Sequence, residues 1–100
     1  MQSLEKRPRH GVLGRGVTVR EDVFRDLRLG RRDYVIKEHD EWNAEKFLKT
    51  PVTHLYVARR TDPRGECLRL KVTDVRVVHL ENRFQSGDYI KISVIRENTL

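Results

Sequence analysis

The sequence predicts a small α+β fold rich in β-strands: a β-barrel or a strongly bent mixed sheet, with one capped helix near the N-terminus. Three features support this class. Valine, leucine, isoleucine and phenylalanine make up 29 of the 100 residues, which is enough for a small hydrophobic core. Sixteen residues are valine or isoleucine and only two are alanine, a balance typical of strands rather than of a helical bundle. A chain of this length holds one domain, which we assign to residues 10–97, after a flexible basic arm at residues 1–9.

The first clear element is a helix over residues 19–29. Thr18 and Glu21 match the capping box, in which a Ser or Thr at the N-cap is followed three residues later by Glu. Gly30 is the residue type expected just after a helix ends. Apolar residues recur at helical spacing in this segment: Val19, Val23, Phe24 and Leu27.

The rest of the chain is predicted mainly as strands. Residues 34–37 form a short strand, and residues 40–49 form either a short helix capped by Asp40 or an irregular loop. Apolar and polar residues alternate in three later segments, which are residues 54–58, 68–72 and 90–94. The alternation changes phase near Asp74, which predicts a bulge or a sharp bend there. Turns are predicted at residues 62–65 and at Ser86-Gly87.

The charge of the chain favours an anionic partner. The sequence has 21 Lys and Arg residues against 15 Asp and Glu residues, a net charge of +6. The excess is concentrated in the first 20 residues, whose cations are Lys6, Arg7, Arg9, Arg15 and Arg20. A nucleic acid, an acidic protein surface or anionic lipid would suit this charge, while a merely basic surface is the plain alternative.

Several classes of site and location are not indicated. No apolar run approaches the roughly 20 residues of a membrane-spanning helix, and the N-terminus lacks the apolar stretch of a signal peptide. Cys67 is the single cysteine, so no internal disulfide can form and a reducing cytoplasm is expected. The four histidines are widely spaced, and neither a metal site nor a cofactor is predicted.

Three stretches of the chain follow the motifs of a known family. Residues 24–37 parallel an amphipathic helix ending in Gly, followed by G-K-K-T-x-E-I-R. Residues 64–75 parallel T-G-x-x-L-x-V-K-V-T-Y-V, and residues 90–94 correspond to a final strand. Over residues 23–94 the chain therefore resembles the ASCH-like branch of the PUA-like superfamily, in particular a small ASCH-related family of phages and bacteria that is mostly uncharacterised. The resemblance implies a PUA-like β-barrel.

The same resemblance argues against a hydrolase. Some ASCH-like proteins are amidohydrolases of acetylated cytidine with a lysine, a threonine and a glutamate, and these positions fall here on Arg32, Asp33 and Val35. Arginine effectively cannot lose its proton to activate a nucleophile. No threonine occurs between Thr18 and Thr50. We therefore assign no catalytic residue, and hydrolysis of a modified nucleoside is the least favoured hypothesis.

The preferred hypothesis is a non-enzymatic nucleic-acid-binding module, with RNA favoured. PUA-like barrels that bind RNA use a cleft between the first helix and the sheet, so the resemblance implies a cleft lined by Arg28, Arg31, Arg32 and Lys37. Trp42 lies in a polar context and is predicted to stack on an unpaired base, or alternatively to form a lid on the barrel mouth. The arm would add Lys6, Arg7 and Arg9.

The alternative hypothesis is a small phage-type accessory protein that binds and modulates a host protein. Its basic face would then meet an acidic partner surface. The expected location is the cytoplasm in both cases, and the host cytoplasm if the chain is phage-encoded.

Overall fold

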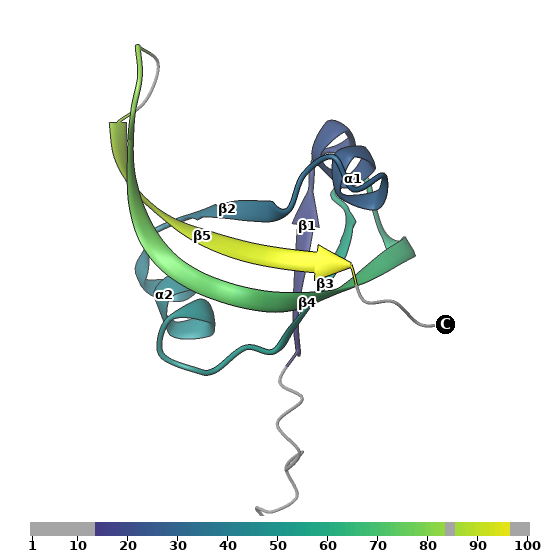
Figure 1. Cartoon of the computed structure of the whole chain (residues 1–100), viewed down its shortest axis with the longest axis horizontal. Helices are drawn as coiled ribbons and strands as arrows, with labels where there is room; N and C mark the ends of the chain where they lie inside the picture. The colour runs from purple at the N-terminus through teal and green to yellow at the C-terminus, as the bar shows by residue number, and fades with distance from the viewer. Residues whose placement is uncertain (1–13, 84–85, 97–100) are drawn as a thin grey trace, which may run out of the picture.

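The computed structural model describes residues 14–83 and 86–96. In this part of the chain five strands and two helices follow one another (Figure 1). In chain order they are β1 (Gly14–Val19), α1 (Glu21–Arg28), β2 (Tyr34–Glu38), α2 (Glu41–Phe47), β3 (His54–Arg59), β4 (Asp62–Glu81) and β5 (Ser86–Arg96). The basic arm predicted at residues 1–9 lies outside the described residues.

The strands form one mixed sheet in the order β1-β3-β4-β5-β2. β1 and β3 are parallel and all other neighbours are antiparallel. β4 is strongly bent and carries the sheet around the core (Figure 1). The α+β class and the bent mixed sheet are therefore confirmed. The sheet is open, with β1 and β2 as its two edge strands, so a closed PUA-like barrel is not confirmed.

The hydrophobic core lies inside the curved sheet and is covered by both helices. α1 contributes Phe24 and Leu27, and α2 contributes Phe47. The alternation predicted in the later strands points the apolar residues toward this core, with Leu68 and Val72 partly buried against it. The strand residues in the core cluster are Val17, Val19, Val35, Leu55, Val57, Leu70, Ile90, Ile92 and Val94.

The start of the first helix differs from the prediction. α1 begins at Glu21, and its N-cap is Arg20, whose side chain makes no capping hydrogen bond. Thr18 instead lies in β1, opposite Ala58 of β3. The capping box is therefore wrong. Val17 and Val19 alternate into the core as strand residues, and this burial outweighs one capping hydrogen bond. The predicted end is confirmed, because Gly30 follows the helix with a φ of +76°.

The second helix is confirmed and has the predicted cap. Asp40 precedes α2, and its Oδ1 accepts a hydrogen bond of 2.7 Å from the backbone N–H of Asn43. We expect Asp40→Ala to lower the free energy of unfolding by about 1 kcal/mol in urea titrations, because it removes this bond. Thr18→Ala should cost clearly less, since Thr18 caps no helix. An equal loss for the two variants would contradict the assignment of the caps.

The bulge is confirmed, whereas both turns are displaced. Val72 lies opposite Val94 and Asp74 lies opposite Ser93, so Thr73 is the extra residue of a bulge in β4. The first reversal is at residues 60–61, because Asp62 already pairs with Arg59; residues 62–65 belong to β4. β4 ends at Glu81 and β5 begins at Ser86, so Ser86-Gly87 lies in a strand. Both predicted turns are therefore wrong in position.

Candidate nucleic-acid interface

Two lysine side chains reach the carbonyl groups of the edge strand β1. Lys37 of β2 donates a hydrogen bond of 3.2 Å from its Nζ to the carbonyl oxygen of Thr18 in β1. Lys46 of α2 places its Nζ 3.5 Å from the carbonyl oxygen of Gly16, two residues earlier on the same strand. Both carbonyls lie on the unpaired edge of β1. Lys37 thus links the two edge strands of the open sheet, and Lys46 links α2 to the same edge of β1.

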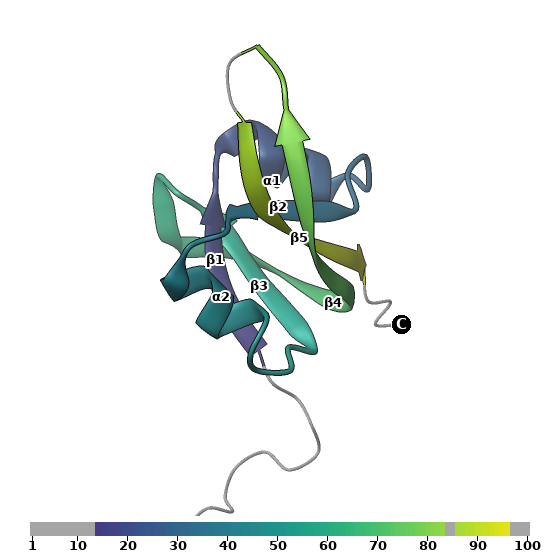
Figure 2. The same ribbon diagram turned by 90° about the vertical axis from the view of Figure 1, so that its left-hand side faces the viewer.

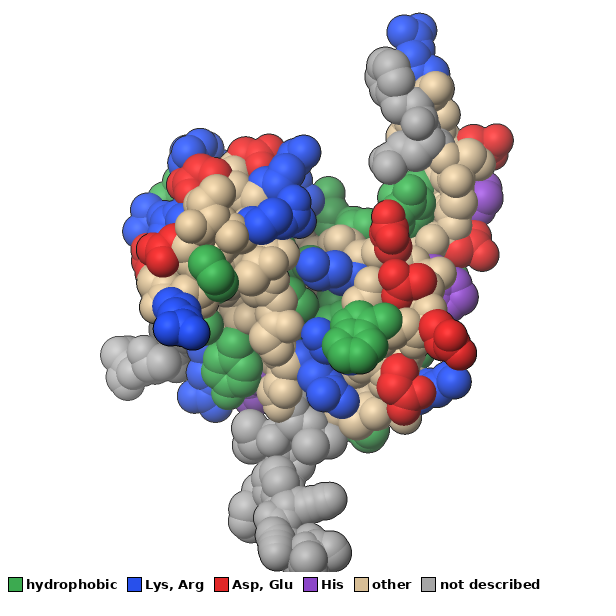
Figure 3. Space-filling view, turned by 180° about the vertical axis from the view of Figure 1, so that it is seen from behind, with side chains coloured by type: hydrophobic (Ala, Val, Ile, Leu, Met, Phe, Trp, Pro, Cys, Tyr) green, Lys and Arg blue, Asp and Glu red, His purple; other side chains and the backbone are tan. Residues whose placement is uncertain are grey.

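Two hollows lie along this opening. The larger, of about 450 Å³, is lined by residues of α2 and of the strands β1 to β4, including Lys37, Trp42, Lys46 and Tyr56. The smaller, of about 180 Å³, is lined by Arg20, Arg32, Lys37 and Arg60, among others. Because Thr18 and Lys37 line both hollows, we treat them as one feature and call it the seam groove. The rear face of the molecule is hollowed near its middle, where Lys and Arg side chains lie beside hydrophobic ones (Figure 3).

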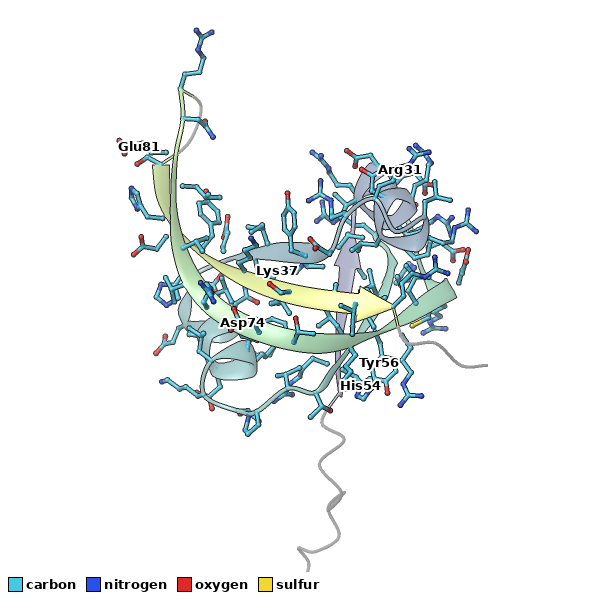
Figure 4. All side chains as sticks on the ribbon, viewed as in Figure 1. Arg31, Lys37, His54, Tyr56, Asp74 and Glu81 are labelled. Atoms are coloured by element: carbon cyan, nitrogen blue, oxygen red, sulfur yellow. The ribbon has the colours of Figure 1, made fainter. Side chains whose placement is uncertain are left out.

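The cations of the seam groove are close enough to influence one another. Burial lowers the pKa of the Lys37 ammonium below its usual value, and the neighbouring charges of Arg60 and Lys46 lower it further. Figure 4 labels Lys37 on β2, which in that view runs between the two helices. Within the described part of the chain, no carboxylate lies within ion-pair distance of Lys37, Lys46 or Arg60. The three like charges are therefore not ion-paired within this part of the protein.

Trp42 forms an aromatic wall at one end of the seam groove. It is the most exposed of the large hydrophobic side chains in the described residues, with 72% of its surface accessible. Lys46 lies one helical turn further along α2, and its Nζ is 5.9 Å from the centre of the Trp42 ring. The other side of Trp42 is acidic, with Asp40, Glu41 and Glu45 around a shallow hollow. The basic character is thus confined to the side that faces the groove.

Two of the four predicted cleft residues line the seam groove, and two do not. Lys37 and Arg32 lie in it. Arg28 instead extends from the last turn of α1 toward β4, where its Nη1 is 3.4 Å from Glu66 Oε2. Arg31 is exposed, with its Nη1 4.0 Å from Asp26 Oδ1. The predicted arm residues Lys6, Arg7 and Arg9 lie outside the described part of the chain.

Arg32 combines burial with an aromatic contact. Its guanidinium lies 4.8 Å from the centre of the Tyr34 ring. Its Nε is buried and has no hydrogen-bond partner among the described residues. The side chain is thus held by stacking, and part of its donor capacity is unused.

Sequence reasoning missed several residues of the seam groove: Arg20, Lys46, Tyr56 and Arg60. Lys46 had a detectable signal, because residues four apart on a helix are neighbours and Lys46 follows Trp42 by four. Arg60 had no such signal. Its position depends on the hairpin reversal at residues 60–61, which the sequence pattern places at residues 62–65.

Other chemistry is not indicated at this site. The described residues contain no group of three His, Cys, Asp or Glu side chains that could hold a metal ion. Cys67 borders the larger hollow as a free, exposed thiol. Neither of the two helices described is long and apolar enough to cross a membrane. A comparison of the chain with known proteins finds no matching family model, no matching curated protein and no matching solved structure.

Proposed function

We propose that the seam groove binds single-stranded nucleic acid without chemical turnover, with RNA as the favoured ligand. The observation that carries this proposal is the cluster of Lys37, Lys46 and Arg60. Like charges held together without a carboxylate cost free energy, and a bound anion relieves that cost. A nucleic-acid backbone provides a row of such anions, and the groove provides a row of cations that also includes Arg32. Arg20 lines the groove as well, but its guanidinium is ion-paired with Asp22 at 2.9 Å.

The exposed indole of Trp42 supports a single strand rather than a duplex. Unpaired bases stack on aromatic side chains at a gain of roughly 1–3 kcal/mol per base, whatever their sequence. In a duplex the bases are already stacked and cannot reach the ring. We place phosphates at Lys37 and Arg60 and stack one base on the Trp42 ring. Lys46 lies one helical turn from Trp42 on α2 and is close to that ring. Contacts of this kind position the strand and read little sequence.

Binding of labelled oligonucleotides tests the proposal. Fluorescence anisotropy should show that single-stranded RNA binds more tightly than duplex RNA at about 50 mM salt. The logarithm of the association constant should fall with the logarithm of salt concentration, with a slope of about 0.7 for each phosphate that the protein neutralises. Single-stranded DNA of the same sequence tests the preference for RNA.

Absence of binding at that salt concentration would overturn the nucleic-acid proposal. The same cations would then be available for the carboxylates of an acidic protein, the alternative derived from the charge of the chain. A pull-down with and without nuclease separates the two cases, because a protein partner held directly stays bound after nuclease treatment.

A further inference from the structure

The edge strand β2 and its neighbour β5 have a second face, on the side away from the core. Residues of a strand alternate between its two faces, and Val35 of β2 lies in the core with its partner Ile92 of β5. Their neighbours along each strand therefore lie on the opposite side. We call this side the outer face and define it by two cross-strand pairs, Tyr34 with Ser93 and Ile36 with Lys91. In both ribbon views β2 and β5 lie between α1 and the projecting end of the β4–β5 hairpin (Figures 1 and 2).

The ring of Tyr34 is in contact with two cations. Arg32 precedes it by two residues, and the guanidinium carbon of Arg32 is 4.8 Å from the ring centre. The Nζ of Lys91 is 5.0 Å from the same centre. Both distances are typical of cation–π contacts. One aromatic ring thus holds two positive charges close together.

Neither of these cations has an ion-pair or hydrogen-bond partner among the described residues. Of the polar side-chain atoms in the partly or fully buried residues described, only Arg32 Nε is buried without a partner. The Nη groups of Arg32 and the ammonium of Lys91 therefore reach solvent. Two carboxylates lie on the same side of the sheet: Asp74 is 2.7 Å from Arg76 Nε, and Glu38 forms no ion pair with Lys91. The donors of both cations are thus available to an anion from solution.

Arg32 connects the outer face with the seam groove. It lines the smaller hollow of the groove, together with Lys37 and Ile36, which lie on opposite faces of β2. The hollow therefore reaches both sides of this edge strand, whose outer edge is unpaired. A strand that fills the groove and continues past Arg32 next meets the ammonium of Lys91.

We propose that a nucleic-acid strand bound in the seam groove leaves it at Arg32 and continues over the outer face, where Lys91 binds a further phosphate. The inference rests on the proposed function and extends it, because it gives the bound strand a direction and a longer site. A polyanion fits better than a single small anion, since the two cations continue the row of cations in the groove. Tyr34 is a positioning residue, whose ring holds both cations in place.

Salt dependence measured with oligonucleotides of two lengths tests this extension. Oligouridines of about 4 and about 12 nucleotides span the range of single-strand site sizes. Anisotropy should give a steeper salt dependence for the longer oligonucleotide, because only the longer strand reaches from the seam groove to Lys91. A longer strand also has more registers on a short site, but that raises its affinity without changing the slope.

Substitutions on the outer face should act only on the longer oligonucleotide. Lys91→Met should weaken its binding by roughly three- to tenfold and make its salt dependence shallower by about 0.7, with the shorter one unaffected. Tyr34→Leu should weaken binding of the longer one at least as much, whereas Tyr34→Phe keeps the ring and should bind like the wild type. Lys71→Met is the matched control. Lys71 is exposed, lies opposite Ile95, four residues beyond Lys91 on β5, and lines neither hollow.

Three results would overturn the extension while leaving the seam groove as the whole site. They are an equal salt dependence for the two lengths, an unchanged affinity of Lys91→Met for the longer oligonucleotide, and a loss for Lys91→Met no greater than that for Lys71→Met. Failure of both lengths to bind is a different result, because it overturns the proposed function and the extension with it. Circular dichroism spectra matching the wild type establish that the variants fold.

Discussion

Lys37→Met is expected to weaken binding of single-stranded RNA by at least about tenfold, because a charge-assisted hydrogen bond contributes roughly 1.5–3 kcal/mol. The side chain lines both hollows of the seam groove, so its removal interrupts the row of cations at its centre. The dependence of affinity on salt should become shallower by about 0.7 for a single-strand contact. Anisotropy titrations at several salt concentrations measure both quantities.

The same substitution is expected to change how the free energy of unfolding depends on pH. Burial and the charges of Arg60 and Lys46 lower the pKa of Lys37, so the charged side chain is less favourable in the folded chain than in the unfolded one. A lysine with a lowered folded-state pKa costs stability at neutral pH. That cost is relieved as pH rises through the folded-state pKa toward the usual value of 10.5. Methionine has a similar length and carries no charge, so it removes the cost at every pH.

Urea unfolding of wild-type and Lys37→Met proteins at neutral and at alkaline pH tests this sign. The stability of the variant relative to the wild type should fall as pH rises, while the loss of the Lys37–Thr18 hydrogen bond adds a cost that does not depend on pH over the range where the wild-type lysine stays charged. Arg31→Ala is the matched control, because it also removes one cation but lies outside the seam groove. If Arg31→Ala weakens RNA binding as much as Lys37→Met does, the binding depends on net charge and the groove has no particular role.

The sequence could predict those parts of the fold that depend on neighbouring residues. The cap at Asp40 depends on a residue three positions away, and the bulge at Thr73 shows directly as a change of phase in the alternation. The capping box at Thr18 has an equally local signal, yet it is wrong. The same residues also fit a strand, and pairing of β1 with β3, some 40 residues later, decides between the two structures.

The seam groove could be predicted only in part, for the same reason. It lies between β1 and β2, which are the two edge strands of the sheet and do not pair with each other. Lys37 and Arg32 stand out in the sequence near β2. Their proximity to Arg60 and Lys46 depends on how the open sheet curves, which no local pattern specifies. Trp42 stands out as an aromatic residue among charges, although its exposure is visible only in the folded chain.

Trp42→Ala is expected to weaken binding of single strands by roughly 1–3 kcal/mol, or about 5-fold to 150-fold, because one base can no longer stack. Duplex binding should be almost unchanged, because duplex bases are already stacked. The salt dependence should also be unchanged, since no phosphate contact is removed. Stability should hardly fall, because the side chain is 72% exposed. Anisotropy with matched single-stranded and duplex oligonucleotides measures the difference.

Two comparisons separate stacking at Trp42 from general attraction to a basic protein. Leu48→Ala removes another exposed apolar side chain, at the C-cap of the same helix, and should leave binding unchanged. Deleting residues 1–9 removes Lys6, Arg7 and Arg9 and should weaken binding of single strands and duplexes alike, with a shallower salt dependence. If that deletion costs as much as Lys37→Met while Trp42→Ala has no effect, the chain attracts nucleic acid through its charge alone. If Trp42→Ala binds single strands less tightly than the wild type but binds duplexes equally well, a base must stack on the indole ring. The strand is then held in the seam groove.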